Sequence, residues 1–364
     1  MTSVAIATLV DEDNFGNRLQ NWALQEALLR MGCDMVETIV SVPGAHNGYE
    51  PVTRAYHLIR GQGRAVVRAG LQRLASGPPA IEAHVSPLAE FSRSRVRFGA
   101  RYSSPAAHGV LPDGYDHVIV GSDQVWNPVF GLPLGLDFLE FAREEQRIAY
   151  AGSFGVDSIP RRLRTRYRSG LAGIPHLSVR EVQGQRIVRQ LSGRDAVRVV
   201  DPTLLHDDSF WLSFAREREL PPRPAFAAVA LLAASGSRKA EASIERLEEE
   251  GLGVVDLLAR EGEGRHGKSS PQEFLNLISA AECVLTDSFH VASFALLFGK
   301  PLELLGRPGM NSRLATLLDI VGLTDSEFLK DGTGRIDRFD SAQVLERIAA
   351  ARGRSLDYLV RSLD

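Results

Sequence analysis

The chain has 364 residues, of which 44% are hydrophobic and 24% are charged. This length suits about two domains, and the composition is that of a globular protein, which excludes a disordered chain or a fibre. The formal net charge is −3, so the composition gives no indication of nucleic-acid binding, which usually requires a strongly basic domain.

Two further features predict a soluble cytoplasmic protein. The first ten residues lack the positive charge and the cleavage site of a signal peptide, and the longest apolar run, 225–234, is far shorter than the roughly 20 residues of a spanning helix. Cys33 and Cys283 lie in apolar runs, far apart in the sequence. They exclude a disulfide framework or a cysteine-built zinc site, and we expect both to be buried free thiols in a reducing compartment.

The first half of the sequence alternates short apolar runs with helical patterns, which is typical of parallel βαβ units. A helical stripe over 19–31 is followed by Gly32, which stands where a C-terminal helix cap belongs. We expect strands at 4–10, 35–40, 117–120, 147–151, 177–179 and 197–200.

The stretch 43–107 interrupts this alternation and contains many more arginines than acidic residues. Within it, 60–74 has the pattern of an amphipathic helix. Two interpretations stay open. The stretch is either a basic face that contacts an anionic, lipid-linked acceptor at a membrane surface, or a solvated pair of surface helices.

The second half repeats the alternation. We expect strands at 225–233, 253–258, 283–286 and 302–305, and helices at 238–250, 271–281, 291–298 and 311–321. We expect the junction between the halves to lie between Pro202 and the proline-rich stretch 221–224, or slightly before them. The prediction is an α/β protein with a Rossmann-like domain over 1–200, which carries the basic insertion at about 43–107, and a second Rossmann-like domain over 201–364 with C-terminal helices. Two such domains facing across a cleft resemble the GT-B architecture.

Ligands of parallel α/β sheets bind beyond the carboxyl ends of the strands, and this rule selects four loops. The first loop is 13–18, where Asn14 or Asn17 can cap the next helix and Gly16 permits close backbone approach. It is either a ligand loop or a capped turn. The fourth is the glycine-rich stretch 261–268, which is either a mobile lid or a flexible surface loop.

The second loop, 121–128, places Ser122, Asp123 and Gln124 at the end of a buried strand, where polar groups are costly to desolvate unless they are paired. Trp126 offers a flat apolar wall that could back a sugar ring. The alternative is a turn in which Asp123 caps the next element.

The third loop, 286–290, precedes a helix. Asp287 and Ser288 are ordinary N-cap residues, and His290 falls in the first helical turn, where backbone N–H groups lack partners. Together they could hold a carboxylate or phosphate and supply a proton. The alternative is a helix-start histidine that bonds a nearby carbonyl.

Taken in order, these motifs resemble the polysaccharide pyruvyl transferase family. The resemblance extends from the first strand to the helix after Asn311 and does not include 43–107 or the tail after Leu323. The matching segments are 14–25, 120–128, 148–155, 178–181, 201–205, 286–290, 298–301 and 311–313.

The resemblance implies a GT-B-like fold and transfer of the pyruvyl group of phosphoenolpyruvate to a sugar of a polysaccharide or glycan precursor, as a ketal, with release of phosphate. His290 and Arg180 stand where the family has a histidine and an arginine. One branch of the family has Arg-Leu-His where this chain has Ser288-Phe289-His290. The arginine of that branch, which binds phosphoenolpyruvate, is thus absent, and Arg313 or Arg18 is the candidate replacement.

From these residues and the resemblance we assign expected roles. His290 is the acid, Asp123 is the base or orients a hydroxyl, and Asp287 could orient His290. The expected donor-binding residues are Arg180, Ser288, Arg313, Arg18 and Asn17, and the expected acceptor-binding residues are Ser122, Gln124, Trp126 and Asn14. No metal and no cofactor is expected, with phosphoenolpyruvate as co-substrate.

Three alternatives remain open. One is a nucleotide-sugar-dependent glycosyltransferase of similar architecture. Another is a non-catalytic relative that binds glycans. The third keeps the pyruvyl transfer chemistry and uses a small metabolite as the acceptor.

Overall fold

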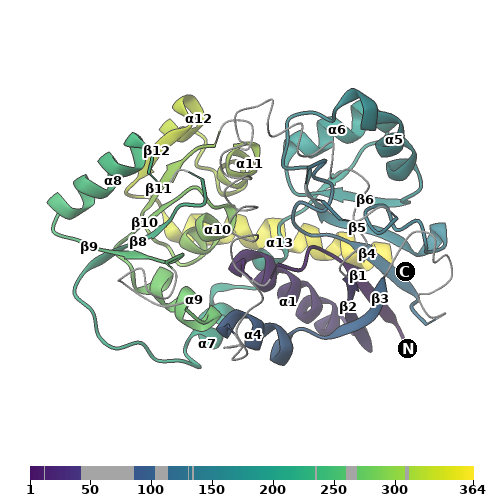
Figure 1. Cartoon of the computed structure of the whole chain (residues 1–364), viewed down its shortest axis with the longest axis horizontal. Coiled ribbons are helices and arrows are strands. Elements are labelled where there is room, and N and C mark those ends of the chain that lie inside the picture. Colours follow the sequence, from purple (N-terminus) through teal and green to yellow (C-terminus); the bar gives the residue numbers. More distant parts are fainter. Residues whose placement is uncertain are drawn as a thin grey trace, which may run out of the picture.

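The computed structural model shows an α/β molecule with one β-sheet in each half (Figure 1). It describes residues 1–11, 13–41, 86–102, 114–129, 131–132, 135–233, 236–259, 269–307 and 311–364. The expected amphipathic helix at 60–74 and the glycine-rich loop at 261–268 lie outside the described residues, as does most of the basic insertion.

The first sheet has 7 strands in the order β3-β2-β1-β4-β5-β6-β7, and all of its neighbouring strands are parallel. This is the strand order of a doubly wound Rossmann sheet, whose direction of winding reverses between β1 and β4. The strands are β1 (Ser3–Ala7), β2 (Met35–Ser41), β3 (Phe98–Tyr102), β4 (His117–Val120), β5 (Arg147–Gly152), β6 (His176–Val179) and β7 (Val197–Arg198).

The helices of the first half are α1 (Phe15–Arg30), α4 (Pro87–Arg95), α5 (Arg164–Ala172) and α6 (Val182–Ser192). Helix α1 begins where the Asn14 side chain accepts a hydrogen bond from the Asn17 N–H, and it is followed by Gly32 with a φ of 97°. Its buried face includes Gln25, whose amide donates to Thr38 of β2 at 2.8 Å. This buried hydrogen bond fixes the position of α1 along the sheet, in addition to the apolar contacts that bury the helix.

The second sheet has 5 strands in the order β12-β11-β10-β8-β9, and only its edge strand β12 is antiparallel. Its direction of winding reverses between β8 and β10, as in flavodoxin-like sheets. The strands are β8 (Phe226–Ala230), β9 (Gly253–Asp256), β10 (Cys283–Thr286), β11 (Leu302–Leu305) and β12 (Thr333–Ile336). The helices are α7 (Asp208–Ala215), α8 (Arg238–Glu249), α9 (Pro271–Ala280), α10 (Phe289–Leu297), α11 (Ser312–Val321), α12 (Glu327–Asp331) and α13 (Ser341–Leu363).

The two halves share one hydrophobic core. Phe15 of α1 stacks on Phe274 of α9 with ring centroids 4.5 Å apart, and Trp22 of α1 packs against Phe214 of α7 at 4.7 Å. Apolar burial of this kind is the main stabilising contribution to any fold. Because it crosses between the halves, it also sets how the two sheets face each other. The expected fold class, two Rossmann-like α/β units, is confirmed.

Helix α13 returns from the second half to the first sheet and runs across the molecule (the yellow ribbon in Figure 1). The Tyr358 hydroxyl donates to the carbonyl of Ala149 at 2.9 Å, and the backbone N–H of Val200 donates to Ser355 Oγ at 3.0 Å. The end of the chain, which the sequence pattern assigned to the second domain, therefore packs against the first.

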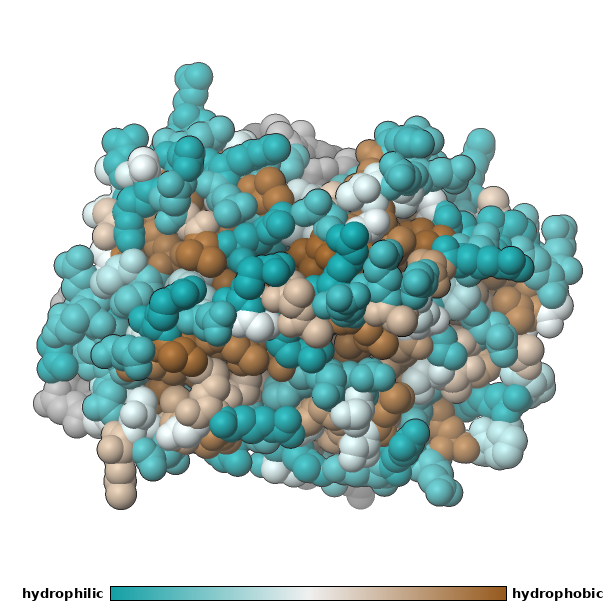
Figure 2. Space-filling view, turned by 180° about the vertical axis from the view of Figure 1, so that it is seen from behind, coloured by the Kyte–Doolittle hydropathy of each residue, from teal (hydrophilic) through white to brown (hydrophobic). Residues whose placement is uncertain are grey.

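Both cysteines are free and buried, as expected from their apolar surroundings, and burial raises their pKa values. Among the described helices, none combines the length and the apolar character needed to cross a bilayer. Figure 2 shows that hydrophobic residues on the rear face lie interspersed among hydrophilic ones, which is normal for a protein surface.

Replacing Ser355 with alanine should lower the free energy of unfolding by about 1–3 kcal/mol, because the buried N–H of Val200 would lose its acceptor. Ser362→Ala is the matched control. Ser362 lies on the same helix, is also buried, and bonds only to the carbonyl of its own helix four residues back. Urea unfolding of both variants measures the difference, and equal effects would show that the contact between α13 and Val200 does not stabilise the protein.

Candidate active site

Polar side chains from the carboxyl ends of both sheets meet in one cluster between the two halves. The first half contributes Asn17 after β1, Ser122 and Asp123 after β4, Arg180 after β6 and Asp201 after β7, and the second half contributes His290 after β10 and Arg313 of α11. The loops after β1, β4 and β10 leave their sheets at the points where the winding reverses, which is where α/β proteins bind ligands.

Asp201 is the centre of this cluster. One carboxylate oxygen accepts hydrogen bonds from the Thr203 N–H at 3.0 Å and the Thr203 hydroxyl at 2.8 Å. The other accepts from Arg180 Nη1 at 2.5 Å and from the Ser122 hydroxyl at 3.1 Å, and it lies 3.5 Å from His290 Nε2. Burial opposes ionisation, but the charges of His290 and Arg180 and the Thr203 hydrogen bond outweigh it and hold the pKa of Asp201 well below its usual range.

Asp201 was not among the expected site residues, although its segment matched the family resemblance. The signal that could have found it is an Asp-Pro-Thr sequence directly after a strand.

Arg180 joins the two buried aspartates. Its Nη2 lies 3.4 Å from Asp123, and its guanidinium lies 4.4 Å above the ring of Phe289. Asn17 donates to the other oxygen of Asp123 at 3.2 Å. Burial raises the pKa of Asp123, but the charges of Arg180, His290 and Arg313 lower it by more. Asp123 is thus an ionised, fully engaged carboxylate.

His290 lies in the first turn of α10 and packs against the first half. A Cβ atom built on Gly16 would lie 2.1 Å from its Nδ1, so only glycine fits at this position of α1. The side chain is 9% exposed, and Nε2, which faces Asp201, has no hydrogen-bond partner within the described part of the chain. The sequence predicts that Gly16 permits a close approach of the backbone, and in the structure the backbone at Gly16 does lie close to the His290 side chain of the other half.

Arg313 is a buried cation without a described partner. It is 6% exposed and forms no hydrogen bond or ion pair with residues of the described ranges, and its Nε is fully buried. Burial and the nearby charge of Arg180 lower its pKa to about 10. Arg313 lines a narrow cavity between the halves together with Arg180, Asp201 and Phe289. A buried guanidinium of this kind points to an anionic ligand.

The cluster offers cations and carboxylates rather than a metal cage. In the described ranges, no three histidine, cysteine or carboxylate side chains are placed to hold a metal ion.

Trp126 does not face the cluster. It is 1% exposed, its Nε1–H donates to the carbonyl of Asp137 at 2.7 Å, and its ring packs on Phe154 in the core of the first half. The expectation that it stacks on a sugar is therefore wrong for this structure, because the core takes its whole apolar surface. Gln124 accepts a hydrogen bond from Asn127 at 3.0 Å, and Asn14 caps α1.

Asp287 and Arg18 also contact other groups than expected. The two oxygens of Asp287 accept hydrogen bonds from the N–H groups of Leu232 and Ala233 at 2.7 and 2.8 Å. The carboxylate beside His290 is that of Asp201 instead. Arg18 donates to the carbonyl of Leu9 at 2.6 Å and to the Asn17 side chain, so it organises the loop after β1. Ser288 is the N-cap of α10, but its side chain makes no capping hydrogen bond.

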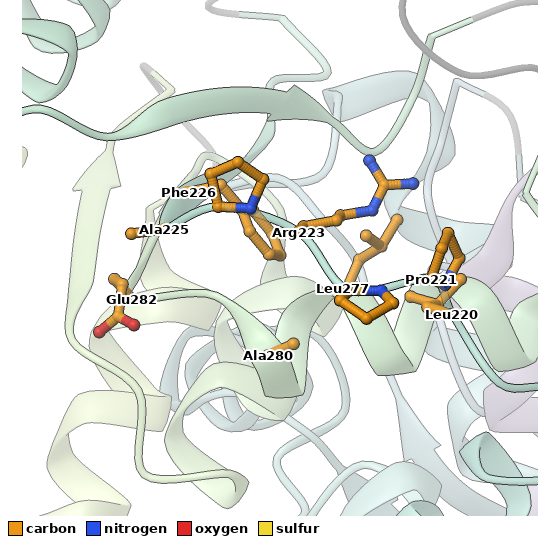
Figure 3. A pocket seen from close by; sticks show the side chains of 10 residues that line it. Leu220, Pro221, Arg223, Ala225, Phe226, Leu277, Ala280 and Glu282 are labelled. Atoms are coloured by element: carbon orange, nitrogen blue, oxygen red, sulfur yellow. The ribbon is translucent and has the colours of Figure 1, made fainter.

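A second pocket lies at the opposite end of the second sheet, where β8 and β10 begin (Figure 3). Its lining is mainly proline and aliphatic, with Arg223 and Glu282 as charged members. Lying at the amino ends of the strands, it is not the candidate site.

Comparison with known proteins identifies a family. The family model described as polysaccharide pyruvyl transferase matches residues 14–302. No curated protein matches the chain.

Three solved structures illustrate the structural similarities. UDP-GlcNAc 2-epimerase from Neisseria meningitidis, bound to UDP-GlcNAc, has 10% identity and a TM-score of 0.48, with 100% of this chain and 99% of that chain covered. The epimerase from Methanocaldococcus jannaschii, in complex with UDP-GlcNAc and UDP, has 13% identity and a TM-score of 0.46, with 99% and 98% covered. The E. coli ADP-heptose LPS heptosyltransferase II has 13% identity and a TM-score of 0.35, with 97% and 99% covered.

Replacing Asp201 with asparagine should lower the free energy of unfolding by about 3–5 kcal/mol at pH 7, because it leaves the buried Arg180 without its closest counter-charge. The folded-state pKa of Asp201 lies below the unfolded value of about 3.9, so its contribution is present above that pH and declines as the pH falls below it. The difference in the free energy of unfolding between wild type and Asp201→Asn should therefore be smaller at pH 3 than at pH 7, by about 1 kcal/mol.

Asp195→Asn is the control, since Asp195 pairs with Arg189 on the surface and its side chain is 76% exposed. This change should cost less than about 1 kcal/mol. Urea unfolding at both pH values measures these differences. An Asp201 variant as stable as the Asp195 variant would show that the buried cluster is not anchored on Asp201.

Proposed function

Because the chain belongs to the polysaccharide pyruvyl transferase family, a family of transferases, we propose that it transfers the pyruvyl group of phosphoenolpyruvate to a sugar of a polysaccharide or glycan precursor. The product would be a ketal, and phosphate would be released. The reaction would take place at the cluster around Asp201.

The observation that carries this proposal is the buried guanidinium of Arg313, which has no described partner and lies at the same interface as Arg180 and His290. Phosphoenolpyruvate has a carboxylate and a phosphate, and a guanidinium binds either group through paired hydrogen bonds. Helices α10 and α11 both begin at this interface, and neither N-cap side chain uses the free N–H groups of its helix. Those N–H groups support anion binding beside Arg313.

His290 is the proposed acid. In the first step it gives a proton to the methylene carbon of phosphoenolpyruvate, which becomes a methyl group, and the adjacent carbon becomes cationic. A sugar hydroxyl attacks that carbon and forms a C–O bond. The C–O bond to phosphate then breaks, and a second hydroxyl closes the ketal. One hydroxyl proton replaces the proton that His290 gave up, and the other leaves with phosphate.

We propose that Asp201, rather than Asp287, orients His290. Its oxygen lies 3.5 Å from Nε2, and the bonds from Thr203, Ser122 and Arg180 hold that carboxylate in place. A fixed, ionised carboxylate stabilises the imidazolium and sets the direction of the ring. Arg180 pairs with Asp201 and Asp123, so its main role is to provide a positive charge that keeps both carboxylates ionised.

The donor would serve as co-substrate, without a cofactor, and the acceptor would be a free or lipid-linked glycan. With Trp126 in the core, the acceptor must bind through other groups. The two buried free thiols suit the reducing cytoplasm, which we propose as the compartment of the reaction.

Incubation of the purified protein with phosphoenolpyruvate and a panel of lipid-linked and nitrophenyl sugars should release phosphate in step with a pyruvylated product. His290→Ala should abolish this release without unfolding the protein, because Asp201 keeps its bonds to Arg180, Ser122 and Thr203. His176→Ala, at the amino end of β6, is the matched control and should retain activity. Protection against thermal unfolding by a nucleotide sugar and not by phosphoenolpyruvate would favour a glycosyltransferase instead.

Gly16→Ala should reduce phosphate release by about 100-fold, because the added methyl group would displace the His290 ring and small misplacements of a catalytic group are costly. Gly353→Ala, in α13, is the control, since a Cβ there meets nothing within 4 Å. It should leave the rate unchanged and slightly stabilise the helix. Steady-state phosphate release, with circular dichroism to verify folding, tests both. A fully active Gly16→Ala enzyme would contradict the contact between α1 and the histidine.

A further inference from the structure

Glu181 is a buried carboxylate adjacent to the cluster. It directly follows Arg180 and stands at the N-cap of α6, yet its side chain does not cap that helix. Instead, its Oε1 accepts hydrogen bonds from the Ser153 hydroxyl at 3.0 Å and from the Phe154 N–H at 3.1 Å. The side chain is 2% exposed. These two bonds fix the carboxylate through one oxygen and leave the other oxygen free of them.

The second oxygen, Oε2, is buried and has no hydrogen-bond partner in the described ranges. A buried carboxylate oxygen without a donor is costly, so such a group in a folded protein calls for an explanation. The charged groups that act on Glu181 are Arg180 from the end of β6 and Arg313 from α11. Neither forms an ion pair with it in the described ranges.

Glu181 lies at the seam between the two halves. The N–H of the next residue, Val182, donates to the Thr316 hydroxyl of α11 at 3.2 Å. The start of α6 therefore lies against the helix that carries Arg313. An unbonded acceptor oxygen and an unpaired cation thus belong to the same interface, one from each half.

Both carboxylates of the cluster itself, Asp201 and Asp123, already accept hydrogen bonds through both of their oxygens. Both oxygens of Asp201 accept hydrogen bonds, and Asp123 uses one oxygen for Arg180 and the other for Asn17. Nearby positive charges lower the pKa of both groups, which makes them weak proton acceptors. Asp123, the base expected from the sequence, is therefore poorly suited to that role.

We propose that Glu181, through Oε2, is the general base that takes the proton from the attacking hydroxyl of the acceptor. This inference rests on the proposed function. As the hydroxyl oxygen forms its bond to the cationic carbon of the donor, its O–H bond breaks and the proton moves to Oε2. The protonated Glu181 then gives that proton to the departing phosphate, and the second hydroxyl returns a proton to His290. Both residues end the cycle in their starting states.

The test is Glu181→Gln. The glutamine oxygen can still accept from Ser153 and Phe154, so the substitution replaces only the basic Oε2 with an amide NH₂. We expect kcat for phosphate release to fall by about 100-fold or more, with thermal stabilisation by phosphoenolpyruvate unchanged.

Glu303→Gln is the matched control. Glu303 of β11 is also buried, at 6% exposed, and accepts a hydrogen bond from Ser243 at 2.6 Å, outside the cluster. It should keep the wild-type kcat. If wild type releases phosphate and Glu181→Gln matches it in kcat, the base role is overturned and the proposed function stands. Weaker binding of phosphoenolpyruvate with an unchanged kcat would likewise overturn the base role, by placing Glu181 on the donor side. A wild-type protein that releases no phosphate with any acceptor overturns the proposed function itself.

Discussion

The contact on which the site depends is that of one fully buried carboxylate with groups from both halves of the molecule. Asp201 holds Arg180 at 2.5 Å and the Ser122 hydroxyl at 3.1 Å within the first half, and lies 3.5 Å from His290 of the second half. A carboxylate is stable away from water only when hydrogen bonds and opposite charges replace its hydration. The burial of Asp201 thus requires Arg180 and Ser122 to stay in place. The same carboxylate oxygen also attracts the imidazole of His290.

This arrangement needs the halves to be held in a defined relation. The shared apolar core supplies that relation, with Phe15 stacked on Phe274 and α13 returning to the first sheet. The fit of Gly16 against His290 depends on it, because the two residues belong to different halves and meet at a distance that leaves no room for a methyl group. Close packing in the core is therefore needed for the chemistry proposed for the site, because it keeps Gly16 against His290. The same packing buries the polar residues of α1 at the interface.

Four buried polar atoms near the interface have no hydrogen-bond partner within the described ranges, namely His290 Nε2, Glu181 Oε2 and the Nε atoms of Arg180 and Arg313. Buried polar groups are normally hydrogen-bonded, because each unmade bond costs free energy. Further unpartnered atoms lie elsewhere in the described ranges, so these four support the proposed ligand site without identifying it. Phosphoenolpyruvate together with a sugar would supply both anionic oxygens and hydroxyl donors.

The sequence by itself determined the alternation of strands and helices, the parallel sheets and three of the loops that contribute to the candidate site, because these follow from local periodicity, glycine caps and the strand-end rule. The predicted strands at 117–120, 283–286 and 302–305 coincide with β4, β10 and β11, and Gly32 does follow α1. The sequence pattern predicts C-terminal helices in the second domain, but not that the long helix α13 packs against the first sheet. Only the tertiary structure decided which polar groups pair: Asp201 rather than Asp287 beside His290, Trp126 in the core, and Glu181 with a free oxygen. Pairing across the halves depends on distances between residues remote in sequence, and these are set by how the shared core packs.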